Sequence, residues 1–215
     1  MNPGNLFRNT IRTCANLLRS LRRKGLTCIL LPIHGSYPER TPRRDPLPPP
    51  FNRLLSRPVE PSLEGMQAVM ERLGADPRVE TVVLRFGTLQ AGAAALDSLR
   101  RMVLDLRSKG KRVVAWLPSA ATWEYYLASA CNEIAIPPSG RLSVLGVRLE
   151  AVFAKDALAL IGVEADLESI AEYKTAPDTF RRATMSEPHR EMLDAILDSI
   201  MDTAVAAIAE GRGLD

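Results

Sequence analysis

The chain has 215 residues, of which 46% are hydrophobic and 25% charged, a composition that is typical of a globular domain and excludes a low-complexity or collagen-like protein. The formal net charge is +3, but residues 1–60 hold 11 Lys and Arg against 3 acidic residues, whereas the remainder holds 17 against 22. No apolar run reaches the roughly 18–20 residues that span a bilayer, and no apolar stretch typical of a secretory signal follows the basic amino terminus.

The first predicted element is an amphipathic helix over residues 6–24. Its apolar face carries Leu6, Phe7, Ile11, Cys14, Leu17, Leu18 and Leu21, and its other face is rich in arginine. Such a helix could lie on an anionic membrane surface. It could also pack on the body of its own chain or of a partner chain, and we favour this second interpretation because helices of globular proteins share the pattern.

Residues 26–33 follow as a mostly apolar predicted strand. Residues 37–61 then contain eight prolines, which exclude regular structure and predict an extended arm or linker. We therefore expect three parts: a basic amphipathic helix at 1–25, a strand with a proline-rich arm at 26–61, and an α/β domain at 62–215.

Helices and strands alternate from residue 62 onward. The predicted helices cover 63–74, 91–109, 123–130, 151–161 and 186–210, and the predicted strands cover 79–86, 112–117, 133–136 and 164–170. This alternation predicts βαβ units with right-handed crossovers and hence a mostly parallel sheet. The fold class is predicted to be α/β.

Few residues in the chain could bind a metal or a cofactor. The cysteines Cys14, Cys28 and Cys131 lack Cys-x-x-Cys spacing and are expected to be reduced thiols. The two histidines, His34 and His189, are far apart in sequence, so we predict no zinc site and no cofactor. His189 falls in the first turn of a predicted helix, where we expect it to be solvated. The basic end lacks interleaved aromatic residues, so no nucleic-acid partner is expected.

Lys174 is the candidate catalytic residue. It lies between Tyr173 and a small residue, three positions before Pro177, in a turn that follows the predicted strand 164–170. An amine there would lie at the mouth of a strand, where α/β proteins tend to place their chemistry. A lysine amine acts as a base only when desolvation disfavours its charged form. Most lysines are exposed and do no chemistry, so only the surrounding segments can indicate whether Lys174 is catalytic.

Several segments resemble one known family in their order and spacing. They are YYLASACNEI at 125–134, SVLGV at 143–147 and YKTAPDTF at 173–180, and the similarity extends over roughly residues 79–213. They resemble the signal peptide peptidase A family, also called protease IV. The resemblance implies a ClpP/crotonase-like fold of stacked βαβ units and peptide hydrolysis by a Ser-Lys dyad. It also implies that Lys174 is the general base. In long members of that family, one half supplies the lysine and the other the serine.

The chain departs from the family pattern at two loops. Thr122, Trp123 and Glu124 stand where a catalytic domain has Ser-Gly-Gly, and the loop 87–92 replaces a Pro-Gly-Gly element that supplies oxyanion donors. A bulky ring and an acid beside the nucleophile position argue against acyl chemistry there. We expect Tyr125 and Tyr126 to serve packing, and Glu172 to be exposed.

The resemblance therefore implies a serine peptidase subdomain that acts on peptides such as signal peptide remnants, with Lys174 as base. The nucleophilic serine is expected to lie outside this sequence, in a second half after residue 215. We also expect a homo-oligomeric ring, in the cytoplasm or at the membrane surface through residues 6–24. The alternative is a catalytically inactive assembly module of the same fold. A crotonase-type acyl-thioester enzyme is disfavoured because the loop 87–92 offers only two glycines.

Overall fold

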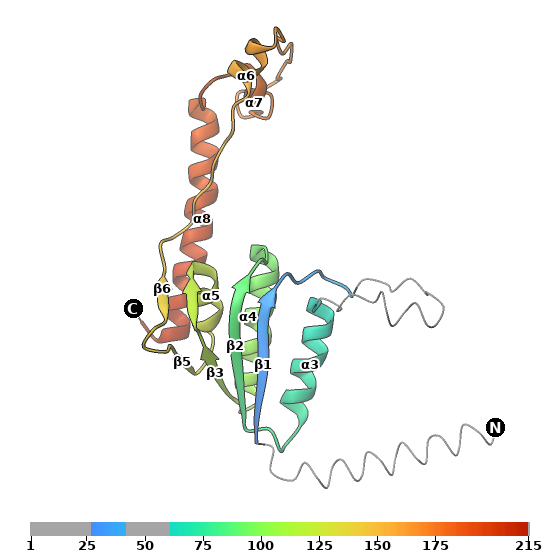
Figure 1. Ribbon diagram of the computed structural model, residues 1–215, viewed down its shortest axis with the longest axis vertical. Coiled ribbons are helices and arrows are strands. Elements are labelled where there is room, and N and C mark those ends of the chain that lie inside the picture. Colours follow the sequence, from blue (N-terminus) through green and yellow to red (C-terminus); the bar gives the residue numbers. More distant parts are fainter. Residues whose placement is uncertain (1–26, 42–60, 215) are drawn as a thin grey trace, which may run out of the picture. The chain divides into compact units, whose positions relative to one another are not determined.

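The computed structural model describes residues 27–41 and 61–214 (Figure 1). The predicted helix 6–24 and most of the proline-rich arm lie outside the described residues. The chain divides into two compact units, residues 1–143 and 144–215.

A four-stranded parallel sheet forms the centre of the first unit. Its strands are β1 (Cys28–Gly35), β2 (Thr81–Leu89), β3 (Arg112–Trp116) and β5 (Glu133–Ala135), in the spatial order β1-β2-β3-β5. Leu30 pairs with Val83, and Val83 pairs with Val114, so the strands run side by side in parallel. The prediction of an α/β fold with stacked βαβ units and a mostly parallel sheet is confirmed.

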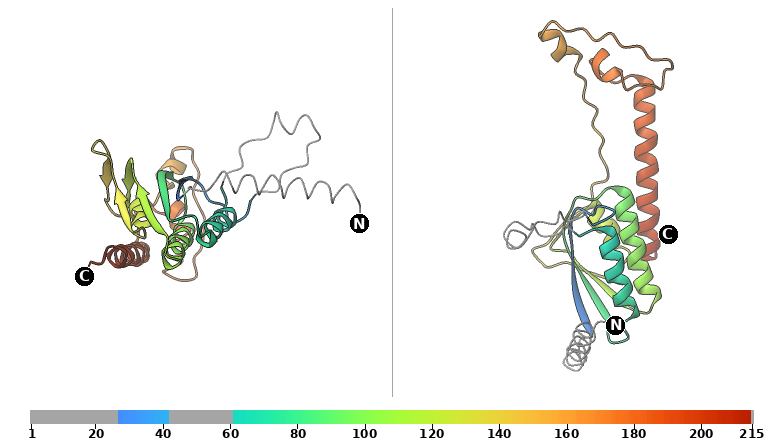
Figure 2. Two further views of the ribbon diagram at one scale, coloured as in Figure 1. Left: turned by 90° about the horizontal axis from the view of Figure 1, so that it is seen from below. Right: turned by 90° about the vertical axis from the view of Figure 1, so that its right-hand side faces the viewer.

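Helices α3 (Leu63–Ala75) and α4 (Ala93–Ser108) cover one face of this sheet, as Figure 2 shows. Ser62 begins α3, because its Oγ accepts the N–H of Gly65 at 3.0 Å. The helices bury an apolar stripe against alternate strand residues, which is what the periodicities of helix and strand require. This core includes Met66, Met70, Leu99, Val103, Leu106, Val82, Leu84, Val113 and Ala115.

A second, two-stranded parallel sheet was missed from the sequence. It consists of β4 (Ser119–Ala121) and β6 (Arg141–Ser143), in which Ser119 pairs with Arg141. The short helix α5 (Thr122–Ala128) follows β4 directly. With only three residues each, these strands have no apolar periodicity that a sequence pattern could reveal.

A buried arginine joins α4 to α5. Arg100 is 3% exposed, and it donates to the carbonyl oxygen of Tyr126 at 2.9 Å and to Ser129 Oγ at 2.8 Å. Its guanidinium carbon also lies 5.1 Å from the centre of the Tyr126 ring. Tyr126 is buried, so its predicted packing role is confirmed, while Tyr125 is half-buried.

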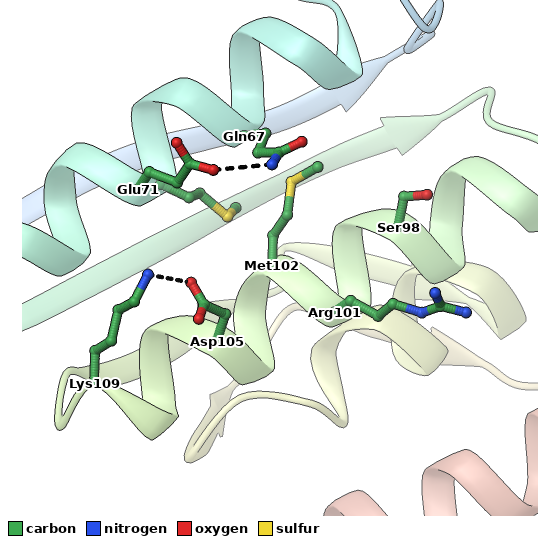
Figure 3. Close-up of a pocket in the computed structure, with 8 residues that line it drawn as sticks. Gln67, Glu71, Ser98, Arg101, Met102, Asp105 and Lys109 are labelled. Carbon is green, nitrogen blue, oxygen red and sulfur yellow. Dashed lines mark hydrogen bonds and ion pairs between the residues drawn. The ribbon is translucent and has the colours of Figure 1, made fainter.

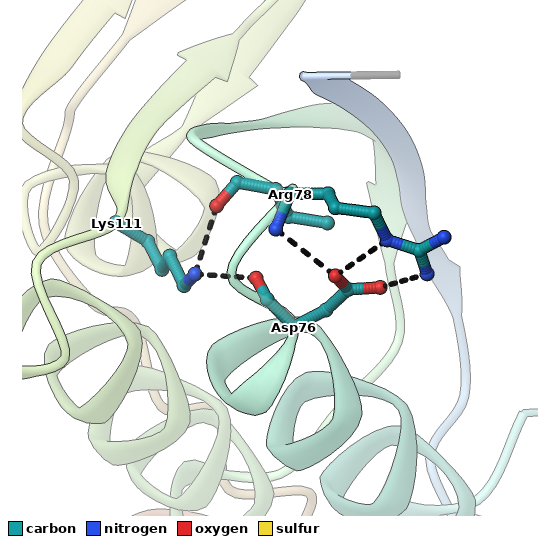
Figure 4. Close-up of polar contacts among 4 residues, drawn as sticks. Asp76, Arg78 and Lys111 are labelled. Carbon is teal, nitrogen blue, oxygen red and sulfur yellow. Dashed lines mark hydrogen bonds and ion pairs between the residues drawn. The ribbon is translucent and has the colours of Figure 1, made fainter. Parts of the chain in front are cut away.

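A buried lysine holds the turn between α3 and β2 (Figure 4). Lys111 Nζ donates to the carbonyl oxygens of Asp76 and Val79 at 2.7 Å and 2.8 Å. On the exposed side of the same turn, Arg78 forms an ion pair with Asp76 at 2.6 Å. This hydrogen-bonded guanidinium holds the pKa of Asp76 well below its usual range.

The second unit contains three helices among its described residues: α6 (Lys155–Leu160), α7 (Asp178–Arg181) and α8 (Glu187–Arg212). Helix α8 is confirmed, and Gly213 ends it with φ +63°. The predicted helix 151–161 is shorter in the structure, because the N–H of Ala154 donates to Thr179 at 2.7 Å instead of joining a helix.

The predicted strand 164–170 is wrong. These residues form no regular structure, and most of their side chains are exposed. The alternation of acidic and apolar residues suits a half-buried strand, but a strand also needs a neighbour for its hydrogen bonds. None of the strands described in residues 27–41 and 61–214 pairs with this segment.

None of the described helices is both long enough and apolar enough to cross a bilayer. Helix α8 has 26 residues, but charged side chains recur along it.

Candidate active site

Lys174 lies on an exposed turn of the second unit. Its N–H donates to the carbonyl oxygen of Ala171 at 3.1 Å, and the next carbonyl, that of Thr175, accepts the N–H of Asp178 at 2.9 Å. The turn therefore leads directly into α7. Because no strand precedes it, the predicted position of Lys174 at the mouth of a strand is wrong.

The amine borders an open groove with a volume of about 390 Å³. The residues that line it are Tyr173, Lys174, Thr175, Ala176, Thr179, His189 and Met192. They come from the turn, from α7 and from the first turns of α8, three segments that the chain brings together only on folding. Hydroxyl groups, an imidazole and an amine thus line the same groove as two apolar side chains.

The wall beside Lys174 is held by a charge-assisted hydrogen bond. Tyr173 Oη donates to Glu191 Oε2 at 2.8 Å, which raises the pKa of the Tyr173 phenol because the neutral form is the donor. Glu172 is exposed, as predicted. Across the described ranges, no carboxylate forms an ion pair with Lys174.

His189 is less solvated than its sequence position predicts. Its Nδ1 atom is buried and has no hydrogen-bond partner among the described residues. The ring packs edge-on against Phe153, with centroids 5.9 Å apart and planes at 64°. Phe153 is distant in sequence and lies before α6 in the structure, so the predicted helix 151–161 did not indicate this contact.

The start of α8 is tied to α7 behind the groove. Ser186 Oγ donates to Asp178 Oδ2 at 2.8 Å, which links the residue before α8 to the first residue of α7. Arg181 on α7 donates to the carbonyl oxygen of Leu167 at 2.8 Å. These bonds link α7 to the residue before α8 and to the segment that precedes the Lys174 turn.

The second place of interest is the first turn of α5 in the first unit, which holds Thr122, Trp123 and Glu124. Glu124 is 7% exposed, and its carboxylate accepts two backbone N–H groups, that of Leu89 at 3.0 Å and that of Ala121 at 3.1 Å. The side chain therefore ties the end of β2 to the start of α5. A carboxylate that occupies two N–H donors leaves them unavailable to a substrate oxyanion.

The neighbouring pocket is lined by one carboxylate, that of Glu124, which is already bonded to two N–H groups. It has a volume of about 240 Å³ and is lined by Gly87, Thr88, Ser119, Ala120, Ala121, Glu124, Arg141 and Ser143. Neither lysine nor histidine is among these residues. Trp123 turns its ring edge-on to Tyr126, at 6.1 Å between centroids. The expectation that residues 122–124 do not support acyl chemistry stays a prediction.

A third hollow, of about 440 Å³, lies on the surface between α3 and α4 (Figure 3). Its polar side chains bond to one another: Lys109 pairs with Asp105 at 2.6 Å, and Gln67 donates to Glu71 at 2.9 Å. These are ordinary contacts between residues four positions apart on a helix. The hollow contains none of the residues predicted to act in catalysis.

Comparisons with known proteins point to one family. Residues 105–215 match the family described as peptidase family S49. The chain is 32% identical over 138 residues to the chloroplastic serine protease SPPA of Arabidopsis thaliana, covering 64% of this chain and 20% of that protein. It is 26% identical over 140 residues to protease 4 of Haemophilus influenzae, covering 65% of this chain and 23% of that protein. The matched region thus spans about a fifth of each relative.

Among solved structures, a mutant of the 1510-N membrane-bound stomatin-specific protease is similar to this chain with a TM-score of 0.35. The sequences are 13% identical, and the alignment covers 85% of this chain and 68% of that chain.

Proposed function

Because the chain belongs to peptidase family S49, we propose that it forms part of a serine peptidase in which Lys174 is the general base. The nucleophile is a serine supplied by another segment or another chain, since residues 122–124, at the start of α5, lack the family's Ser-Gly-Gly. The observation that carries this proposal is the family match over residues 105–215, which includes Lys174 and the turn that holds it.

In the proposed reaction, the uncharged Lys174 amine takes the proton of the serine hydroxyl as the oxygen attacks a peptide carbonyl. The resulting ammonium then returns the proton to the leaving amine, and water hydrolyses the acyl-enzyme by the same route. The resemblance to signal peptide peptidase A suggests peptides such as signal peptide remnants as substrates.

The exposed position of Lys174 sets a condition on this mechanism. An amine in water stays charged at neutral pH, so the segment that brings the serine must also cover the groove and remove water from it. Met192 and Ala176 give the groove an apolar lining against which such a segment could pack. Because Glu191 accepts the hydrogen bond of Tyr173, its carboxylate has a partner other than the Lys174 amine.

We propose that the peptidase assembles as a homo-oligomeric ring, in which a neighbouring copy of the complete protein brings the serine-bearing segment over the groove. The second unit supports this, because it presents large apolar side chains to solvent: Leu145 is 91% exposed, Leu160 88% and Ile170 96%. Apolar surface of this kind commonly marks a site of protein association.

A second candidate function, an assembly module without catalysis, is favoured by the bonds of Glu124. Its carboxylate accepts two N–H groups beside the nucleophile position, so in the first unit these donors are not available to a substrate. The two functions make opposite predictions for Lys174, because only the peptidase needs its amine.

The test is hydrolysis of an unfolded fluorogenic peptide by the complete assembly. Lys174→Ala is expected to lower kcat by about 10²- to 10⁴-fold, the range for loss of a general base, without changing the size of the assembly. Lys155→Ala is the matched control, because Lys155 is another exposed lysine of the same unit and should leave the rate unchanged. Equal rates in wild type and Lys174→Ala would favour the assembly module.

A further inference from the structure

Within the described residues of the first unit, one face of the four-stranded sheet carries no helix. Helices α3 and α4 lie behind the sheet in the view of Figure 1, and the opposite face points to the viewer. The strand register places Leu30, Val83 and Val114 in one row across this face, with Trp116 in the next row. Leu30 is 60% exposed and Trp116 37%.

Such exposure is unusual for a parallel sheet, because parallel sheets are almost always covered on both faces. The apolar centre of the face is bordered by charge. Arg85 pairs with Trp116 in the register, and Arg112 forms an exposed ion pair with Glu133 at 2.7 Å. An apolar patch with a polar border is typical of a surface that another element covers.

We propose that residues 6–24 of the same chain dock on this face as an amphipathic helix. The sequence predicts an apolar stripe of seven residues on this segment, with arginines on the opposite side. The stripe would meet Leu30, Val83, Val114 and Trp116, and the arginines would remain in solvent.

The connection to β1 supports this occupant over others. Only residues 25–27 separate the predicted helix from the strand, a link of the usual length between a helix and the strand that follows it. The carbonyl oxygen of Thr27 accepts the N–H groups of Glu80 and Thr81, each at 2.9 Å, so the chain enters β1 at a fixed point. In the proposed arrangement the helix runs antiparallel to β1, which a link of this length allows.

The lengths also agree. A helix of 19 residues is about 28 Å long at 1.5 Å per residue. The eight residues of β1 extend over about 26 Å at 3.3 Å per residue. One helix therefore covers the strand from end to end. A second copy of the chain or an anionic membrane could also use an apolar stripe, but neither accounts for this match in position and length.

Acrylamide quenching of Trp116 fluorescence tests the proposal in the full chain, with Trp123→Phe to leave one tryptophan. The pair Leu17→Gln and Leu18→Gln, on the apolar stripe, should raise the quenching constant at least twofold. The matched pair Arg12→Gln and Arg19→Gln should leave it unchanged. Circular dichroism confirms that each variant is folded.

Three results of this experiment would overturn the proposal. The first is equal quenching in both variant pairs and in the parent chain. The second is quenching of the parent that rises on hundredfold dilution, which would indicate a second copy as the cover. The third is protection of Trp116 only when phosphatidylcholine vesicles with one third phosphatidylglycerol are added, which would indicate a membrane.

Disulfide trapping gives an independent measurement. In a Cys28→Ser chain, the native Cys14 should form an intramolecular disulfide with Val83→Cys or with Val114→Cys, since both lie at the middle of the face. Arg101→Cys, on the exposed side of α4, should form none. A fast-migrating monomer on a non-reducing gel supports the proposal, whereas covalent dimers or unreacted thiols in both variants contradict it.

Discussion

Replacing Glu124 with alanine is expected to destabilise the first unit strongly. The side chain is 7% exposed, and its two carboxylate oxygens accept the N–H groups of Leu89 and Ala121. Each N–H left without a partner in a buried place costs about 1–3 kcal/mol. Because the adjoining pocket can admit water to one of the two groups, we expect a total loss of about 2–4 kcal/mol in the free energy of unfolding.

Glu124→Gln tests how much one of the two hydrogen bonds contributes to stability. The amide keeps one acceptor oxygen, but it turns an NH₂ group toward the second N–H, so the expected loss is about 1–3 kcal/mol. Glu71→Gln is the control, because Glu71 is an exposed acid that accepts only a side-chain hydrogen bond, from Gln67. Its effect should stay within about 0.5 kcal/mol.

The assay is urea unfolding followed by circular dichroism. A lower midpoint at an unchanged slope reports a change in stability without a change in the surface exposed on unfolding. If Glu124→Ala unfolds within about 0.5 kcal/mol of the wild type, the carboxylate does not hold the two loops together. The argument that Glu124 keeps these two N–H groups from a substrate would then have no structural basis.

Three further predictions concern buried groups of the first unit. Lys111→Met removes two charged hydrogen bonds to backbone carbonyls and should lower the free energy of unfolding in urea by about 2–4 kcal/mol. Lys109→Met removes an exposed ion pair with Asp105 and should lower it by about 0.5 kcal/mol. Equal midpoints of the two variants would contradict this. Gly140→Ala would place a Cβ 2.5 Å from the nearest side-chain carbon and should lower Tm. Gly92→Ala, at the N-cap of α4 with nothing within 4 Å, should lower Tm less, because it loses only the preference of an N-cap for glycine over alanine; the reverse order would refute the steric reasoning. Burial raises the pKa of Cys131 to about 12 from 9.0, so in a chain with its other cysteines changed to serine the thiol should stay unmodified by iodoacetamide at pH 8 until urea unfolds the protein. Its contribution to stability should be full below pH 9 and fall as the pH rises toward 12, a loss that should be absent in Cys131→Ala.

The first unit was largely predictable from the sequence because its elements bury regular apolar patterns. Strands β2 and β3 contain the short apolar runs Val82–Leu84 and Val113–Trp116, and α4 buries one stripe of leucines and a valine. Strands β4 and β6 carry no such pattern, so only their pairing in three dimensions defines them.

The second unit was less predictable because residues 164–170 have no neighbouring strand within the described chain. Residues 164–170 alternate like a strand, yet a strand forms only where another strand accepts its hydrogen bonds. The same reasoning applies to the candidate site. Lys174 was found through a family resemblance, whereas the bond from Leu89 to Glu124 joins residues 35 positions apart and leaves no local signal.

The most direct test of the central claim is the rate at which a fluorophosphonate probe acylates the nucleophilic serine of the complete assembly. If Lys174 is the base that activates this serine, Lys174→Ala should slow labelling at neutral pH by about 10²-fold or more, while Lys155→Ala labels at the wild-type rate. Labelling of Lys174→Ala at the wild-type rate would show that another group takes the proton and would contradict the account.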